Sequence, residues 1–390
     1  GASRRLPGGA IAPIMTAVPA LEEAMPGLPL LDLDGAPFER GVAHGRALAD
    51  LIRDNIETYL RRFESGGLER AAVLAEGENW AARLAAFDAD YGEEVRGIAD
   101  GAGLPLGPVA MLNARYELIY SLFSREALAG GAPVDGCTAF GALPERTLSG
   151  GTLIGQNWDW LKTLRGHLAV LRLRAAGKPA FLCITQAGIA GGMIGLNEAG
   201  IGLCLNGLTT DEDGQNTALK PLHVRVRQIL QSPTLHDAIK VIVESDRVCS
   251  ANFLLGHADG EVIDIEAAPT KTGTLYPDDG LLTHANHFVA TPGVTSTMER
   301  ISPSTLYRAP RLARLLRRHD TAIDMQIVQN ALTDHFSHPR SICAHPDPSL
   351  PEAEQSMTVT SVVLALSEQT LYATDGPPCE SPYQAYHLAA

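Results

Sequence analysis

The segment best suited to chemistry is residues 134–140, in which Cys137 directly follows Gly136 at the start of a β-like run. A thiol beside a glycine peptide can attack the preceding carbonyl and move the acyl group from nitrogen to sulfur, after which water hydrolyses the thioester. The product is an amino-terminal cysteine whose own α-amine, with an unperturbed pKa near ~8, suits a base that accepts the thiol proton. The alternative to this chemistry is a purely structural role. In that interpretation the cysteine is a small buried side chain, and Asp135 and Gly136 form an ordinary turn.

Three polar residues downstream are candidates to complete such a site. A tight connection over residues 145–151 would pair the strand that ends near Asp159 with the cysteine strand, which would bring this carboxylate close enough to hold the new ammonium group. Asn206 ends a further strand and Asn252 begins another, and an asparagine amide is an apt donor to a developing oxyanion. Each also has a structural interpretation, as a solvated acid or as a turn-forming asparagine.

Two more groupings of polar residues have simpler explanations. His284, His287, Cys343 and His345 could be imagined as zinc ligands, but they lack the tight paired spacing of structural sites. We therefore predict no metal and no organic cofactor. The arginines at 311, 314, 317 and 318 lie among leucines in a helical pattern, which indicates a solvated helix face.

The elements that must position these residues change in type near residue 130. Residues 1–30 have no sustained period and indicate a loosely packed lead-in, whereas the next hundred are mainly helical, with patterns at 39–63, 80–87, 95–102 and 109–123. A breaker cluster at 129–134 precedes β-type runs at 137–142, 152–157, 168–174, 179–185, 191–197, 201–206, 251–257, 261–267, 358–366 and 370–375, with helical stretches near 221–244 and 303–333. Because the strands come in consecutive runs, we predict the α+β class, with two packed antiparallel sheets and helices outside.

The composition of the chain limits the classes of binding partner and the cellular compartment that we expect for it. The chain has 390 residues, 45% of them hydrophobic, and a formal net charge of -14, which disfavours a nucleic-acid partner and an anionic membrane surface. No apolar stretch is long enough to span a bilayer. The six cysteines form no CxxC pair and fit reduced thiols of a cytoplasmic protein without structural disulfides. Position 1 is Gly rather than Met, which leaves open a removed targeting segment.

Several short motifs carry a family resemblance: FERG (38–41), HG (44–45), LNARYE (112–117), DGCT (135–138), GQNWD (155–159), HANH (284–287) and SICAH (341–345). In this order, over nearly the whole chain, they resemble the N-terminal-nucleophile (Ntn) hydrolase superfamily and, within it, the isopenicillin-N acyltransferase (acyl-CoA:6-aminopenicillanic acid acyltransferase) family. The resemblance implies a four-layer αββα sandwich. It also implies a precursor cut between Gly136 and Cys137 into a helix-rich α fragment, residues 1–136, and a catalytic β fragment, residues 137–390.

The resemblance further implies roles for single residues. Cys137 would be the nucleophile and, through its α-amine, the base, while Asp159 would position that amine. The backbone N–H of Asn206 and the side chain of Asn252 would form the oxyanion hole. The remaining expected site residues either support these groups from behind or contact the substrate: Thr138, Gln156, Asn157 and Arg308, of which Asn157 also has an interpretation as a packing residue.

The implied activity is the transfer of an acyl group from a small N-acyl, peptide-like or acyl-thioester substrate to Cys137 and then to water or to an amine. Hydrolysis and acyl transfer both stay open. Choloylglycine hydrolases are similar, but they carry an arginine where this chain has Gln156 and begin almost at their nucleophile, which weakens an interpretation as a bile-salt amidase. An uncleaved, non-catalytic binding protein on the same fold and a zinc-dependent hydrolase are the rival hypotheses.

Overall fold

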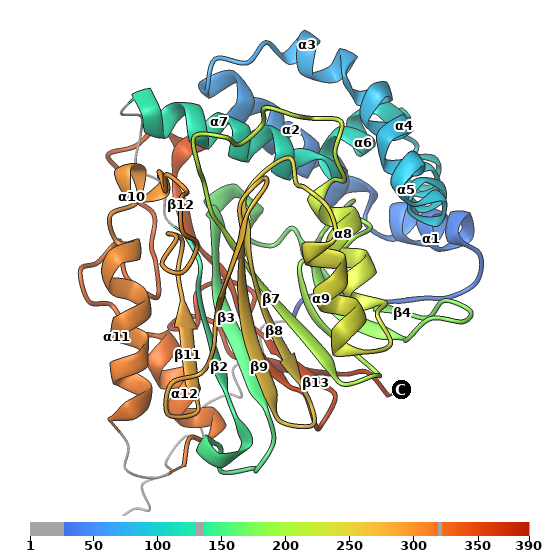
Figure 1. The fold of residues 1–390 in the computed structure, drawn as a ribbon. Helices are drawn as coiled ribbons and strands as arrows, with labels where there is room; N and C mark the ends of the chain where they lie inside the picture. The colour runs from blue at the N-terminus through green and yellow to red at the C-terminus, as the bar shows by residue number, and fades with distance from the viewer. Residues whose placement is uncertain (1–26, 130–135, 319–321, 390) are drawn as a thin grey trace, which may run out of the picture.

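The computed structural model describes residues 27–129, 136–318 and 322–389. Most of the expected lead-in, most of the breaker cluster and Asp135 lie outside these ranges. Within them the strands form two sheets that are stacked face to face, with helices on both outer sides (Figure 1). The predicted α+β class and the four-layer αββα arrangement are therefore confirmed.

The first sheet contains eight strands in the described part of the chain. Their order across the sheet is β1 (Leu30–Leu33), β4 (Leu168–Leu173), β5 (Phe181–Gln186), β6 (Ile194–Asn197), β7 (Ile201–Gly207), β8 (Ala251–His257), β9 (Glu261–Ala267) and β10 (Thr272–Leu275). All neighbours are antiparallel except β1 and β4, which run parallel. This parallel pair departs from the antiparallel prediction. A hairpin would force its two strands to run antiparallel, but a long helical segment separates β1 from β4 and leaves their relative direction free.

The second sheet contains six strands in the same described ranges, and all its neighbours are antiparallel. Their order is β11 (Leu281–His284), β2 (Thr138–Ala142), β3 (Leu153–Leu161), β12 (Ser356–Ala365), β13 (Thr370–Ala373) and β14 (Gln384–His387). The expected hairpin of β2 and β3 is present, with Thr138 opposite Asn157. All ten expected strands exist, whereas β1, β10, β11 and β14 were not expected.

Helices before residue 130 cover one end and one outer side of the sandwich (Figure 1). They are α1 (Pro37–Ala47), α2 (Ala49–Ser65), α3 (Arg70–Ala75), α4 (Gly77–Phe87), α5 (Ala89–Ala102), α6 (Leu106–Asn113) and α7 (Arg115–Ala129). The later helices are α8 (Leu222–Leu230), α9 (Leu235–Val243), α10 (Met298–Ile301), α11 (Thr305–Arg317) and α12 (Met325–Leu332). Each of the long helical stretches expected at 39–63, 221–244 and 303–333 is divided into shorter helices.

Close packing of the two sheets depends on small residues that face the interlayer space. A Cβ on Gly202 would lie 2.5 Å from a methyl carbon of Leu366, and one on Gly256 would lie 2.8 Å from a methyl carbon of Ile154. A second core, between the outer side of the six-stranded sheet and helices α11 and α12, includes Phe140. These two cores fix β2 from both sides, so the chain just after residue 137 is held rigidly.

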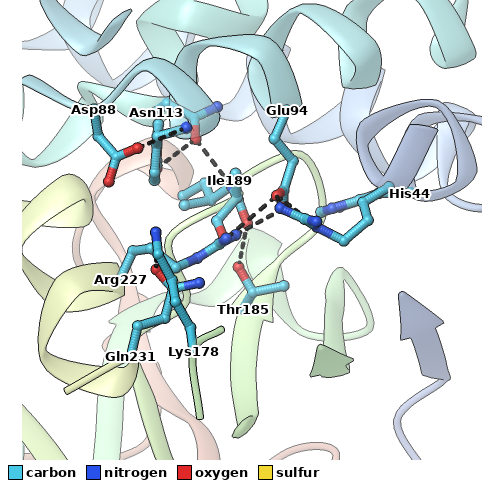
Figure 2. A network of polar contacts seen from close by, with 12 residues as sticks. His44, Asp88, Glu94, Asn113, Lys178, Thr185, Ile189, Arg227 and Gln231 are labelled. Carbon is cyan, nitrogen blue, oxygen red and sulfur yellow. Dashed lines mark hydrogen bonds and ion pairs between the residues drawn. The ribbon is translucent and has the colours of Figure 1, made fainter. Parts of the chain in front are cut away.

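A buried polar network joins the early helices to the rest of the chain (Figure 2). Glu94 of α5 accepts hydrogen bonds from Arg40 of α1, at 3.1 Å, and from Arg227 of α8, at 2.7 Å, and all three side chains are buried. His44 accepts one from the backbone N–H of Gly188 at 3.0 Å, and its burial lowers the pKa of this imidazole to about 4. Residues on the two sides of the expected cut are thus held together by a buried ion-pair cluster.

No helix within residues 27–129, 136–318 or 322–389 combines the length and the apolar character that crossing a bilayer requires.

Candidate active site

Cys137 lies immediately before β2 and is buried, with 3% of its surface exposed. Its Sγ is 3.9 Å from the backbone oxygen of Asp159 on β3. Tyr120 of α7 covers the same region, since a Cβ on Gly207 of β7 would lie only 1.7 Å from the Tyr120 hydroxyl oxygen. Tyr120 also stacks on Trp160, with ring centroids 5.8 Å apart. The thiol is therefore enclosed by the ends of both sheets and by the early helices.

Burial, and then the charge of Asp159, raise the pKa of the Cys137 thiol to about 12. The thiolate form is therefore strongly disfavoured at this position.

Arg308 of α11 is 1% exposed and converges on the backbone around the expected cut. Its Nη1 donates to the carbonyl oxygens of Gly136 and Cys137, both at 2.6 Å, and to the hydroxyl of Thr138 at 2.8 Å. The guanidinium thus touches the carbonyl that a Cys137 thiol would attack. The sequence predicted an arginine that supports the site from further away. In the structure, its guanidinium directly contacts the backbone of Gly136 and Cys137.

Asn286, on the loop after β11, is a member of this cluster that the sequence pattern did not reveal. Its Oδ1 accepts from Nη2 of Arg308 at 2.8 Å, and its Nδ2 donates to the carbonyl of Gly207 at 2.9 Å. A Cβ on Gly136 would lie 2.3 Å from the same Oδ1. A side chain at residue 136 would therefore force either the peptide or the Asn286 amide to move. The only sequence signal was the HANH motif, in which the histidines are the more conspicuous residues.

Asp159 is buried and its Oδ1 accepts a hydrogen bond from the hydroxyl of Thr358 at 2.6 Å. The same hydroxyl oxygen accepts from the backbone N–H of Ala344 at 2.9 Å, so Thr358 is oriented by the loop that follows α12. Thr358 was not predicted either, since a threonine within a β-branched strand gives no signal of function.

Asn206 and Asn252 lie opposite each other on β7 and β8. The amide of Asn206 donates to the carbonyls of His284, at 3.2 Å, and Ala285, at 2.9 Å. The amide of Asn252 donates to Asp264 at 2.7 Å. Burial raises the pKa of Asp264 to about 6. One amide proton of Asn252 therefore has a fixed partner.

Gln156 and Asn157 bind the protein itself. The Gln156 amide donates to the carbonyl of Leu205 at 3.0 Å and accepts from the N–H of Leu205 at 2.6 Å, which ties β3 to β7 of the other sheet. The Asn157 amide donates to the carbonyls of Leu332 and Ile342, both at 2.8 Å. The packing interpretation suits Asn157, and Gln156 connects the two sheets.

The four residues first grouped as zinc-ligand candidates occupy two different places. His284 lies 3.0 Å from Glu266 through Nε2, and Nδ1 of His287 lies 3.0 Å from the hydroxyl of Thr305. Cys343 and His345 instead lie in the loop after α12. The structure does not bring these four residues together.

A cavity of about 430 Å³ lies between β11 and α11. Its lining includes His284, Ala285, Leu306 and Ala309, and Cys137 is not among the residues that line it.

Comparisons with known proteins identify relatives of this chain. The family model for acyl-coenzyme A:6-aminopenicillanic acid acyl-transferase matches residues 147–375, a range that contains Asp159, Asn206, Asn252 and Arg308 but begins after Cys137. The acyl-coenzyme A:6-aminopenicillanic-acid-acyltransferase 40 kDa form of Emericella nidulans is 28% identical over 319 residues, which cover 79% of this chain and 82% of that protein.

Two further proteins are more distant. Acid ceramidase of Rattus norvegicus is 23% identical over 244 residues, 58% of this chain and 59% of the ceramidase. A mutant conjugated bile acid hydrolase from Clostridium perfringens, a solved structure, is 12% identical with a TM-score of 0.46, covering 64% of this chain and 92% of that one.

Proposed function

Because this chain belongs to the acyl-coenzyme A:6-aminopenicillanic acid acyl-transferase family, we propose that it is an enzyme that cuts its own Gly136–Cys137 bond and then moves acyl groups through Cys137. The names of its relatives, a penicillanic-acid acyltransferase and an acid ceramidase, support acyl chemistry on a small amide or thioester substrate. The observation that carries the proposal is the contact of Arg308 with the carbonyl of Gly136.

Self-cleavage begins when Sγ of Cys137 attacks the carbonyl carbon of Gly136. Negative charge develops on the carbonyl oxygen, 2.6 Å from Nη1 of Arg308, which is a hydrogen-bond donor already in place. The C–N bond then breaks, the nitrogen takes up the thiol proton as an amine, and Gly136 is held as a thioester on sulfur. Water hydrolyses this thioester, which releases the carboxylate of Gly136 and restores the thiol.

The new α-amine of Cys137 then serves as the base for turnover. It accepts the thiol proton as sulfur attacks the carbonyl of a substrate, and it returns a proton to the leaving amine or thiol. The buried carboxylate of Asp159, fixed by Thr358, is suited to hold the ammonium form. Water or an amine then attacks the acyl-cysteine thioester and completes hydrolysis or transfer.

The oxyanion of this second reaction forms on the substrate, so it needs donors other than those on the chain's own carbonyl. We assign them to the backbone N–H of Asn206 and the amide of Asn252. Their opposition across β7 and β8 and the anchoring of Asn252 by Asp264 support this assignment.

Intact-mass analysis of purified protein tests the self-cleavage. We expect two fragments that meet between residues 136 and 137, and a single uncut chain for Cys137→Ala. Cys183→Ala removes another buried thiol, on β5, and should still be cut. A wild-type chain that stays whole and does not react with thiol reagents would support a non-catalytic binding protein instead.

Hydrolysis and acyl transfer are separated by supplying a competing amine. The cleaved enzyme is incubated with a small N-acyl amide, or an acyl thioester, with and without a primary amine. An N-acylated amine indicates transfer, and free acid alone, at any amine concentration, indicates hydrolysis. Loss of both products in Asn252→Ala, with the self-cleavage intact, is expected if that residue serves turnover.

A further inference from the structure

A second cluster of chemically capable side chains lies outside the proposed active site. His335, Cys343 and His345 come from the loop after α12, and Cys379 comes from the segment between β13 and β14. One ligand atom from each residue lies within 4.8 Å of the other three. Cys343 is buried and His345 is partly buried, whereas His335 and Cys379 lie at the surface.

Four of the six separations between these atoms are close to the edges of a tetrahedron around zinc, and the other two, from His335 to the two sulfurs, are within 4.8 Å. With Zn–N bonds of about 2.05 Å and Zn–S bonds of about 2.3 Å, two nitrogens lie about 3.3 Å apart, two sulfurs about 3.8 Å and mixed pairs about 3.6 Å. The two Nε2 atoms of His335 and His345 are 3.1 Å apart, and the two sulfurs are 3.6 Å apart. Nε2 of His345 is 3.7 Å from the sulfur of Cys343 and 3.5 Å from that of Cys379.

We propose that His335, Cys343, His345 and Cys379 form a structural site for a tetrahedral zinc ion. Two thiolates and two imidazoles are the donor set that favours zinc over calcium or magnesium. Four protein ligands close the coordination sphere, as is typical of structural rather than catalytic zinc.

Neither a disulfide nor hydrogen bonding alone accounts for the arrangement as well. A disulfide needs sulfurs about 2.05 Å apart, whereas those of Cys343 and Cys379 are 3.6 Å apart. A hydrogen-bonded cluster would not require the near-tetrahedral separations that four of the six atom pairs show. A metal ion explains why two nitrogens and two sulfurs converge on one point.

The surroundings of the cluster fit a metal site that supports its neighbours. Nδ1 of His345 lies 3.7 Å from Glu380, so a carboxylate of the kind that commonly accompanies a ligating histidine is close by. Ala344, between two of the ligands, donates its N–H to Thr358, which donates to Asp159. The ion would therefore tie the loop to the C-terminal segment beside the proposed active site.

This proposal differs from the absence of a metal expected from the sequence. That expectation grouped Cys343 and His345 with His284 and His287, which lie elsewhere in the fold. His335 is eight residues before Cys343, and Cys379 is 34 residues after His345. No familiar spacing of paired ligands links them, so only the fold brings them together.

Metal content and cobalt spectroscopy of the full chain test the site. Protein purified in reducing buffer without chelator should hold about one zinc ion per chain, and replacement by cobalt should give thiolate charge-transfer and tetrahedral d–d bands. Cys379→Ser and His335→Ala should each weaken zinc binding at least about 10-fold, change the cobalt bands and lower Tm. Because both positions lie at the surface, these variants are expected to fold.

His338→Ala is the matched control, since its ring lies 5.2 Å from that of His345 but belongs to no ligand pair. It should keep zinc and the cobalt spectrum. The proposal is overturned if wild-type protein incubated with zinc and desalted retains none. It is equally overturned if Cys379→Ser keeps the wild-type cobalt spectrum, or if reduced protein re-forms a Cys343–Cys379 disulfide in the presence of zinc. None of these readouts depends on self-cleavage or acyl transfer.

Discussion

Nη1 of Arg308 lies 2.6 Å from the carbonyl oxygen of Gly136, although 172 positions separate the two residues in the chain. The guanidinium is buried and also bound to Asn286, so it is fixed before any reaction begins. A fixed donor of this kind stabilises a developing oxyanion without reorganisation.

Replacing Arg308 should therefore slow self-cleavage. We expect Arg308→Met to lower the rate by about 100-fold or more, as loss of an oxyanion donor typically does. Arg308→Lys should fall between this variant and the wild type, since one ammonium replaces a planar fork with several donors. Fragment appearance is followed by gel or mass spectrometry, with circular dichroism as the check on folding. A folded Arg308→Met chain that is cut at the wild-type rate would remove the arginine from the mechanism.

Gly136→Ala should also block the cut, for a steric reason. The new Cβ would lie 2.3 Å from Oδ1 of Asn286, so either the peptide or the amide that holds Arg308 must move. Gly107→Ala is the control, because its Cβ would meet the end of the flexible Glu78 side chain at 3.3 Å and backbone atoms only at the ordinary contact distance of 3.7 Å. We expect an uncut chain from the first variant and normal fragments from the second. Equal cleavage of both would show that the contact with Asn286 has no role.

Local pattern was enough to predict much of the architecture. Alternating and continuous apolar runs located all ten expected strands, and the short connection after residue 142 predicted the hairpin that brings Asp159 to Cys137. The register of a hairpin is set by its turn, which is a local feature, so it can be predicted from the sequence. The edge strands β1 and β14, each four residues long, were not predicted.

Contacts between segments that are distant along the chain could not be predicted from the sequence. Asn286 and Thr358 are ordinary residues in their local segments, and only the packing of β11 and β12 against β2 and β3 gives them their partners. The same holds for His335 and Cys379. Gln156 was assigned to the site by its place in a motif, but its amide is used to join the sheets.

Thr358→Val should impair the proposed active site while leaving the strand intact. The substitution keeps the shape and β-propensity but removes the hydroxyl that donates to Asp159 and accepts from Ala344. Loss of a hydrogen bond to a buried carboxylate costs about 1–3 kcal/mol, which we expect in the free energy of unfolding measured with urea. Cleavage and turnover should slow, and Thr358→Ser should restore both. Failure of serine to restore them would indicate that the methyl group, not the hydroxyl, is important.

Glu94→Gln should weaken the association of the two fragments after the cut. The carboxylate is fully buried between Arg40 and Arg227, which lie on opposite sides of residue 136. Removing one partner of a buried ion pair typically costs about 3–5 kcal/mol. Fragments of this variant should separate at lower urea concentrations in size-exclusion chromatography. Asp50→Asn, which breaks an exposed pair with Arg53, is the control and should behave as the wild type.

Glu117 of α7 should make the stability of the protein depend on pH. Burial raises the pKa of this carboxyl to about 7, although it accepts a hydrogen bond from the N–H of Leu222 at 2.6 Å. A raised carboxyl pKa means that the folded state holds the proton more tightly than the unfolded chain. Its contribution to stability is therefore fully present below about pH 4.5 and is lost as the pH rises towards about 7.

Glu117→Gln keeps an oxygen acceptor for Leu222 but cannot ionise, so it isolates this effect from other titrating groups. Relative to the variant, the wild type should lose about 3 kcal/mol of unfolding free energy between about pH 4.5 and about pH 8, because folding raises the pKa from 4.5 to about 7. Chemical denaturation of both proteins across this pH range measures the difference. A constant difference between wild type and Glu117→Gln at all pH values would mean that the carboxyl titrates alike in the folded and unfolded chains.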